Sequence, residues 1–115
     1  MDSTLSIQIR RIEMNELIER IQEWGVAKGL TGKEGRATVA GQLGKLAEEH
    51  AELIEAIMDG DELEAKDAIG DMTVVLILLC DLLGYDYQEC LQGAYDVISK
   101  RNGKMVDGVF VKETI

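Results

Sequence analysis

The amino-acid sequence predicts an all-α protein, an antiparallel four-helix bundle that ends in a short β-hairpin. The chain has 115 residues, which fits a single domain spanning 1–115. It contains no proline, the strongest helix breaker, and only 4% of its residues are aromatic, so a core must be built from aliphatic side chains. Four segments carry apolar residues at helical spacing, and glycine-containing links separate them.

The first two helices follow from this spacing. Residues 5–24 are expected to form the first helix, capped by one of three hydroxyl residues, Ser3, Thr4 or Ser6. Residues 25–35 hold four of the twelve glycines and are expected to form a loop. The second helix is expected over residues 38–58. Its apolar stripe comprises Val39, Leu43, Leu46, His50, Leu53 and Ile57.

The third helix is expected over residues 62–83 and ends at Gly84. Gly60 suits the end of the helix before it, and Asp61 can cap the new one. The second half of the third helix is apolar on nearly every side, which is typical of a helix in the middle of a bundle.

A fourth helix and a hairpin complete the expected fold. The helix spans residues 86–100, and its inward side chains are expected to be Leu91, Ala94, Tyr95 and Ile98. The pair Asp107-Gly108 between short apolar runs is typical of a two-residue hairpin turn. Because a lone hairpin is marginal in water, we expect it to pack on the bundle or on a partner subunit.

The net charge of −10 excludes several classes of partner. Such a surface repels DNA, RNA and anionic membranes, so we expect no nucleic acid polymer and no membrane as a partner. The apolar run 72–83 is too short to span a bilayer, and it contains Asp81. The chain opens without a signal peptide, and Cys80 and Cys90 match no metal or redox spacing. We therefore expect a cytoplasmic protein with two reduced thiols.

Two acidic clusters are the candidate functional groups. The first, on the second helix, contains Glu48, Glu49 and Glu52, and the second contains Asp67 and Asp71 at the head of the apolar helix. At 100° per residue, Glu49 and Glu52 share a stripe with Lys45 beside the apolar one, whereas Glu48 falls on roughly the opposite side from the core. The short link at residues 59–61 makes the two helices antiparallel neighbours, which brings the clusters together.

Carboxylates gathered inside a bundle are costly. Like charges about 4 Å apart repel by roughly 4 kcal/mol at an effective dielectric of 20. Either some of them take up protons or a cation joins them, and an all-oxygen ligand set suits Mg²⁺ or Mn²⁺. The alternative is a solvated acidic face, with Asp67 paired to Lys45 or to a capping amide.

These motifs carry a family resemblance. Residues 42–53, followed by Asp67-Ala-Ile-Gly-Asp71 and the long apolar helix, resemble the MazG-like branch of the all-α nucleoside triphosphate pyrophosphatases. The family pattern is EExxE followed by ExxD on the next helix, and the resemblance covers roughly residues 20–112. One position departs from it, because Ala68 stands where the pattern has glutamate and Asp67 lies one residue earlier.

The resemblance implies a reaction and a set of site residues. It implies Mg²⁺-dependent hydrolysis of a nucleoside triphosphate to the monophosphate and pyrophosphate, with Mn²⁺ as a substitute metal. The implied role is housecleaning or control of the nucleotide pool. The implied catalytic residues are Glu49, Glu52 and Asp71. The implied metal ligands are these three and Asp67, with Glu48 as a further candidate.

Substrate binding requires cations and a surface for the base. Lys45 shares the carboxylate stripe and is the first candidate for the phosphates. Lys100, Arg101 and Lys104 cluster after the fourth helix and are the second, although cations at a helix end also serve the helix dipole. Trp24 is a candidate for stacking on the base, with a place in the core as the alternative.

Two other interpretations compete with the enzyme. A di-iron carboxylate bundle requires Glu-x-x-His on two helices, but Ala47 stands three residues before His50, the only histidine. The second is a non-catalytic acidic helical module that binds a partner, and Ala68 is its best support. Four short helices barely cover the apolar third helix, so we expect a homodimer or homotetramer.

Overall fold

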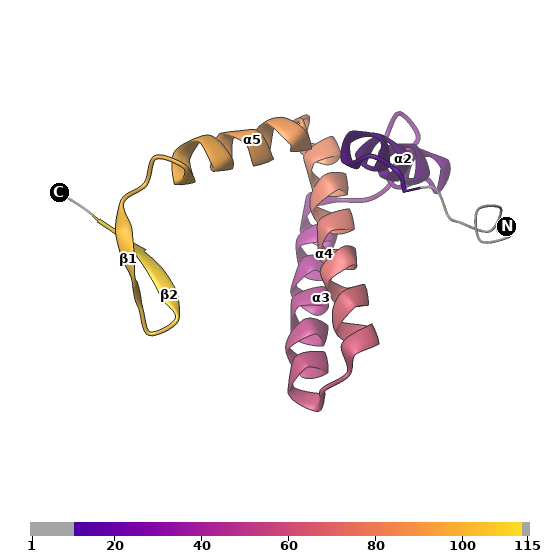
Figure 1. Ribbon diagram of the computed structural model, residues 1–115. Coiled ribbons are helices and arrows are strands. Elements are labelled where there is room, and N and C mark those ends of the chain that lie inside the picture. The colour runs from indigo at the N-terminus through magenta and orange to yellow at the C-terminus, as the bar shows by residue number, and fades with distance from the viewer. Residues whose placement is uncertain (1–10, 114–115) are drawn as a thin grey trace, which may run out of the picture.

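The computed structural model describes residues 11–113, which hold four helices and one two-stranded antiparallel sheet (Figure 1). The elements are α2 (Met14–Ala27), α3 (Val39–Asp59), α4 (Glu62–Leu83), α5 (Tyr87–Ile98), β1 (Gly103–Val106) and β2 (Val109–Lys112). The predicted all-α fold with a C-terminal hairpin is confirmed.

Short polar side chains begin the helices, and glycines end them, at the positions that the sequence predicts. The side chains of Thr38, Asp61 and Asp86 each accept a hydrogen bond from a backbone N–H in the first turn of α3, α4 and α5. Gly60 and Gly84 follow α3 and α4 at positive φ, 70° and 76°, a conformation in which glycine has no steric penalty. The predicted boundaries of α3, α4 and α5 therefore hold to within two residues.

The first predicted helix differs from the observed one. Residues 11–13 are not helical, α2 begins at Met14, and it continues to Ala27. The expected start at residues 5–10 and the expected caps Ser3, Thr4 and Ser6 lie outside the described residues. The helix passes through Gly25 because α2 crosses close to α4 there: a Cβ on Gly25 would lie 2.6 Å from Leu78 Cδ2.

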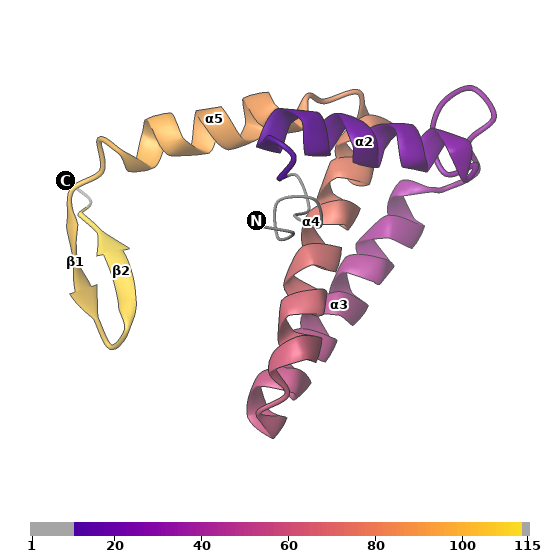
Figure 2. The ribbon, with the colours of Figure 1, turned by 45° about the vertical axis from the view of Figure 1, so that its right-hand side comes forward.

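Helices α3 and α4 lie side by side and antiparallel, as Figures 1 and 2 both show. The seam between them differs from the predicted apolar stripe of α3. Leu43, His50 and Ile57 of that stripe are exposed, whereas Glu49 and Ala56 are buried. The α3 residues in the seam are therefore 42, 46, 49, 53 and 56, which are alternately four and three positions apart. Helix α4 meets α3 on the side of the predicted stripe that carries Glu49, rather than at the centre of the stripe.

Helix α5 and the hairpin extend away from the other helices, and we call residues 87–112 the arm (Figure 1). The chain bends by 109° between α4 and α5. The four α5 residues predicted to face inward are all exposed as a result: Leu91, Ala94, Tyr95 and Ile98. The hairpin pairs Gly103 with Lys112 and turns at Asp107-Gly108 as predicted, and all eight of its strand residues are exposed.

A helix that crosses a membrane needs about 20 predominantly apolar residues. No single helix among residues 11–113 is long and apolar enough to cross a membrane, and α4 with α5 meets the requirement only as a bent pair.

Candidate active site

A pocket of about 770 Å³ lies where the end of α2, the following loop, the start of α3 and the middle of α4 meet. Its apolar lining residues include Trp24 and Leu30 together with Val74, Val75 and Leu78 of α4. Its polar lining residues include Arg36, Gln42, Lys45, Glu48, Glu49 and Asp71. The pocket therefore offers both apolar and charged groups to a ligand.

Glu49 is the best-buried charged residue among those described, with 4% of its surface exposed. One carboxylate oxygen, Oε1, lies 3.3 Å from Nζ of Lys45, one turn earlier on α3. The other oxygen, Oε2, is buried and has no hydrogen-bond partner within residues 11–113. Because burial of an unpaired carboxylate oxygen is costly, this position calls for a donor or a cation.

Asp71 on α4 faces Glu49 across the helix pair. Burial raises the pKa of the Asp71 carboxyl above its ordinary value, and the negative charges of Asp67 and Glu49 raise it further. The pKa of Lys45 is also raised, first by its hydrogen bond to Glu49 and then by the negative charges of Glu49 and Glu48. The fold thus brings together two of the three predicted catalytic residues, Glu49 and Asp71, with Lys45 and Asp67 beside them.

Comparison with known protein families matches residues 31–96 to phosphoribosyl-ATP pyrophosphohydrolase. The match spans α3, α4 and most of α5, and so it includes both acidic clusters. The chain belongs to the phosphoribosyl-ATP pyrophosphohydrolase family. Comparisons with curated proteins and with solved structures found no match.

Membership of the phosphoribosyl-ATP pyrophosphohydrolase family supports the coarse part of the predicted function. The family belongs to the all-α nucleoside triphosphate pyrophosphatase superfamily, which it shares with MazG. The chain is therefore placed among hydrolases that act on phosphorus anhydrides. The narrower resemblance to the MazG-like branch, the substrate and the metal stay predictions.

The third predicted catalytic residue, Glu52, does not line this pocket, although its negative charge contributes to the raised pKa of Lys45. Its side chain is exposed and lines a separate hollow with Glu64, near the link between α3 and α4. Local desolvation, followed by the charges of Asp67 and Asp61, raises the pKa of Glu64. Glu64 was not predicted as a site residue, although its i, i+3 spacing to Asp67 places both on one side of α4.

Two further positions bear on how the acidic pattern fits this chain. Glu48 is exposed but lines the pocket, whereas helix geometry predicted that it points away. That prediction was wrong because the pocket extends from the seam with α4, where Glu49 and Asp71 lie, onto the outer flank of α3. Ala68, at the glutamate position of the pattern, is 1% exposed and packs between the helices.

The donor atoms suit a metal, but they are not gathered into a full ligand set. Among the described residues, no three His, Cys, Asp or Glu side chains are grouped closely enough to hold a metal ion. Glu49 and Asp71 form a pair, and the free Oε2 of Glu49 is the atom that a hard cation would satisfy. The carboxylate oxygens and the negative charge of these two residues therefore suit Mg²⁺ or Mn²⁺.

The predicted substrate residues divide between the pocket and the arm. Lys45 and Trp24 line the pocket, as does Arg36, which the sequence analysis did not single out. Lys100 and Arg101 lie between α5 and β1, Lys104 lies in β1, and none of the three lines this pocket. A role for these three in phosphate binding therefore stays a prediction.

Proposed function

We propose that this family member is a Mg²⁺-dependent nucleoside triphosphate pyrophosphohydrolase. The reaction breaks the bond between the α and β phosphates by attack of water, and the products are a nucleoside monophosphate and pyrophosphate. The observation that carries the proposal is the carboxylate pair of buried Glu49 and half-buried Asp71, which two helices bring to one pocket while Glu49 Oε2 is left without a partner among residues 11–113.

The chain's own residues have distinct roles in this proposal. Glu49 and Asp71 would hold Mg²⁺, with Asp67 beside them and Glu52 and Glu48 as further carboxylates near the site. Bound Mg²⁺ supplies charge neutralisation of the triphosphate, polarisation of phosphorus and a lowered pKa for the attacking water. Lys45 and Arg36, which both line the pocket, would bind phosphate oxygens.

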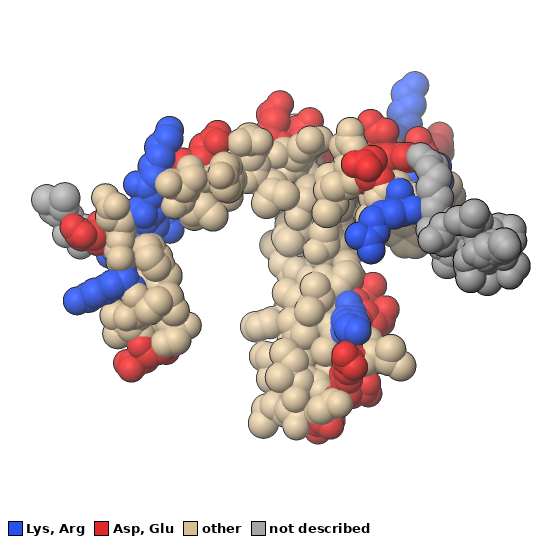
Figure 3. Space-filling model, in the orientation of Figure 1, with Lys and Arg blue, Asp and Glu red and all other residues tan. Residues whose placement is uncertain are grey.

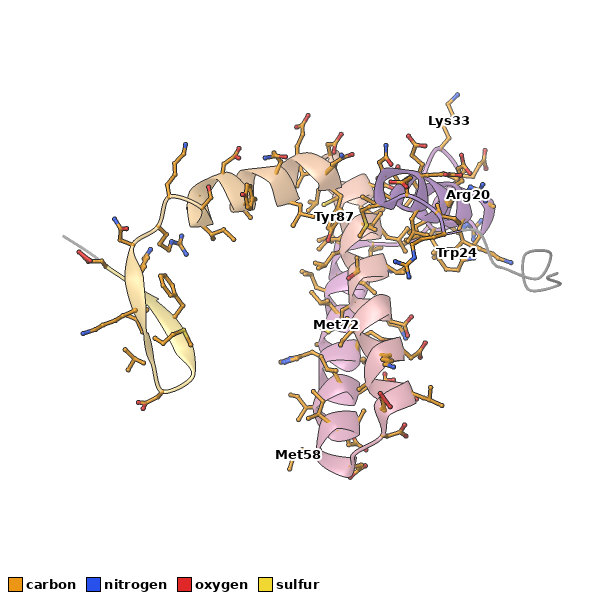
Figure 4. All side chains as sticks on the ribbon, in the orientation of Figure 1. Arg20, Trp24, Lys33, Met58, Met72 and Tyr87 are labelled. Carbon is orange, nitrogen blue, oxygen red and sulfur yellow. The ribbon has the colours of Figure 1, made fainter. Side chains whose placement is uncertain are left out.

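The apolar side chains of the pocket would hold the base. Trp24, labelled in Figure 4, lines the pocket and is 47% exposed, so its indole is accessible for stacking. Because Trp24 is open to solvent, a base that carries a further substituent also fits the arrangement. Phosphoribosyl-ATP, the substrate in the name of the matching family, is such a nucleotide and is the second candidate substrate.

The experiment is a substrate panel with the full chain and Mg²⁺. Canonical and modified nucleoside triphosphates and phosphoribosyl-ATP are incubated separately, and the release of pyrophosphate and monophosphate is measured. We expect monophosphate and pyrophosphate in equal amounts. Preference for modified nucleotides would favour housecleaning, and preference for one canonical nucleotide would favour control of a pool.

Variants in the panel assign the residues. We expect Asp71→Asn and Glu52→Gln each to abolish activity without loss of helicity, whereas Glu55→Gln, an exposed carboxylate on the same helix, retains it. Full activity in either of the first two variants removes that residue from the site. Absence of pyrophosphate with every nucleotide would refute the enzyme and leave the acidic helical module that binds a partner.

A further inference from the structure

Two cysteines meet at the corner between α4 and α5. Cys80 lies three residues before the end of α4 at Leu83, and Cys90 lies three residues after the start of α5 at Tyr87. At a rise of about 1.5 Å per residue, each Cα is about 5 Å along its helix from the corner. The two thiols lie beside each other there, and both cysteines are free. The fold therefore pairs two thiols whose spacing in the sequence matches no redox motif.

The surroundings of the two thiols give them different reactivity. Cys80 is half-buried, and burial raises the pKa of its thiol. The hydrogen bond and charge of Cys90 raise that pKa further, and the negative charges of Asp81 and Asp86 add smaller contributions. The Cys80 thiol therefore stays protonated, whereas Cys90 is exposed to solvent and is the thiol that an oxidant reaches first.

Packing and metal binding do not account for this pair. A cysteine that only fills space in a core is buried, but Cys90 is exposed. A structural zinc site needs four ligands, of which the pair supplies two. Within residues 11–113, His, Cys, Asp and Glu side chains form no group of three that could hold a metal ion. The chemistry that suits two adjacent thiols on their own is formation of a disulfide.

The corner is also the place where a covalent link has the largest effect on the fold. Helix α5 has no buried residue, so few apolar contacts fix its direction relative to α4. The connection between the helices is Gly84, Tyr85 and Asp86. The N–H of Tyr85 donates to the carbonyl oxygen of Cys80 (2.8 Å), and the N–H of Cys90 donates to that of Asp86 (3.1 Å). A bond between the two sulfur atoms would join the helices beside these hydrogen bonds and restrict the 109° bend.

Charge around the corner selects the kind of oxidant. Residues 80–92 contain three acidic residues, Asp81, Asp86 and Glu89, and neither Lys nor Arg. Figure 3 shows acidic side chains on α5 close to its junction with α4. Such a surface repels anionic disulfides, whereas hydrogen peroxide is small and uncharged. The oxidant that fits this corner is therefore hydrogen peroxide.

We propose that Cys80 and Cys90 form a reversible intramolecular disulfide in the presence of hydrogen peroxide, and that this bond fixes the direction of α5 relative to α4. The proposal is independent of the proposed function, because it involves neither the pocket nor a nucleotide.

The reaction has two steps. The Cys90 thiolate attacks one peroxide oxygen and the O–O bond breaks, which leaves a sulfenic acid on Cys90. The hydroxide that departs becomes water with the proton that Cys90 released. The Cys80 sulfur then attacks the Cys90 sulfur, the S–O bond breaks, and water leaves with the Cys80 proton. Two electrons pass from the thiols to the peroxide, which becomes two molecules of water. Dithiothreitol reverses the oxidation by thiol–disulfide exchange and is itself oxidised.

The first test uses the full reduced chain and hydrogen peroxide. The chain has two cysteines, so an internal disulfide removes two hydrogen atoms from its mass and leaves no thiol for alkylation. We expect peptide mapping to show Cys80 linked to Cys90, electrophoresis without reductant to show a single chain, and dithiothreitol to restore both thiols. Chains linked to one another, thiols that stay free, or cysteines oxidised separately to sulfinic acids overturn the proposal.

Two variants serve as controls for this reaction. Cys90→Ser leaves one thiol, cannot form the internal disulfide, and shows what peroxide does to the five methionines alone. Cys90→Ser combined with Leu91→Cys moves the thiol by about 100° around α5, onto another exposed position. We expect the internal disulfide of this double variant to form at least about tenfold more slowly than that of the wild type. An equal rate would overturn the inference that the position of Cys90 beside Cys80 directs the bond.

The second test measures whether the bond fixes the corner. Hydrogen exchange of the Tyr85 and Cys90 amides, which donate the two hydrogen bonds of the corner, is expected to slow at least about tenfold in the oxidised chain. Linking two residues that lie ten positions apart should also raise the Tm by about 10 °C or more. A disulfide that leaves either quantity unchanged overturns the effect on α5. Both measurements are made without nucleotide, so failure of the proposed function leaves their outcome unaffected.

Discussion

Glu49→Gln is expected to stabilise the metal-free protein while removing its response to Mg²⁺. In the wild type, the buried Oε2 has no partner among residues 11–113, and an unsatisfied buried acceptor costs about 1–3 kcal/mol. A glutamine keeps the shape and offers an amide donor to the neighbouring Asp71. The variant loses the ion pair with Lys45, but that side chain is half-exposed, so the loss is at most about 1 kcal/mol.

The net gain is about 1 kcal/mol, which corresponds to a rise in Tm of about 4–8 °C for a domain near this size. Mg²⁺ at a hundredfold excess over its Kd would stabilise the wild type by about 2.7 kcal/mol, and the variant much less, because a ligand is gone. The order of the two melting temperatures should therefore reverse when Mg²⁺ is added.

The assay is calorimetry at a fixed protein concentration, first with a chelator and then with Mg²⁺. Glu55→Gln removes an exposed carboxylate from the same helix and serves as the control. Its stability should lie within about 0.5 kcal/mol of the wild type, and it should keep the full Mg²⁺ response. A Glu49→Gln variant that melts below the wild type in chelator, or that shifts with Mg²⁺ as much as the wild type does, would refute the reasoning.

Three other predictions test the site and the packing. The raised pKa of Asp71 means that the folded state binds the carboxyl proton more tightly than the unfolded state does. The stability of the metal-free protein should therefore fall as pH rises from about 3.8 through the raised pKa. Asp71→Asn should flatten that part of the stability profile, measured by denaturant titrations from pH 4 to 7. Ala68→Glu restores the glutamate of the acidic pattern but buries an unpaired charge between the helices. We expect the free energy of unfolding, measured in urea, to fall by about 3 kcal/mol or more. An unchanged urea midpoint would contradict the observed burial of Ala68. Gly25→Ala places a Cβ 2.6 Å from a Leu78 methyl and should lower the free energy of unfolding by about 1–3 kcal/mol. Gly44→Ala, with open space around its Cβ, should raise it by about 1 kcal/mol. Equal effects of the two variants would show that α2 does not approach α4 as described.

Local features of the fold were readable from the sequence because they depend on neighbouring residues. The caps at Asp61 and Gly60 and the turn at Asp107-Gly108 are set by side-chain hydrogen bonds and by positive φ within a few residues. The pairing of Glu49 with Asp71 was also predictable, since a short link forces the two helices to be antiparallel neighbours.

Other features depend on the direction in which one helix approaches another, and only the tertiary structure decided them. The seam of α3 lies along Glu49 and Ala56 rather than along Leu43 and His50, although both sides have helical spacing. Helical periodicity gives the width of a face but not the angle at which a neighbour meets it. For that reason Glu48, which lines the pocket, was predicted to point away from it, and the separate hollow that Glu52 lines could not be predicted.

The composition, the capping residues and the acidic motifs by themselves determined an all-α chain with a carboxylate pair on adjacent helices. The tertiary structure decided that α5 leaves α4 at a bend of 109° and that its apolar residues stay exposed. The physical reason is that an amphipathic pattern records that a face is to be buried, but does not record whether the covering surface belongs to the same chain or to another.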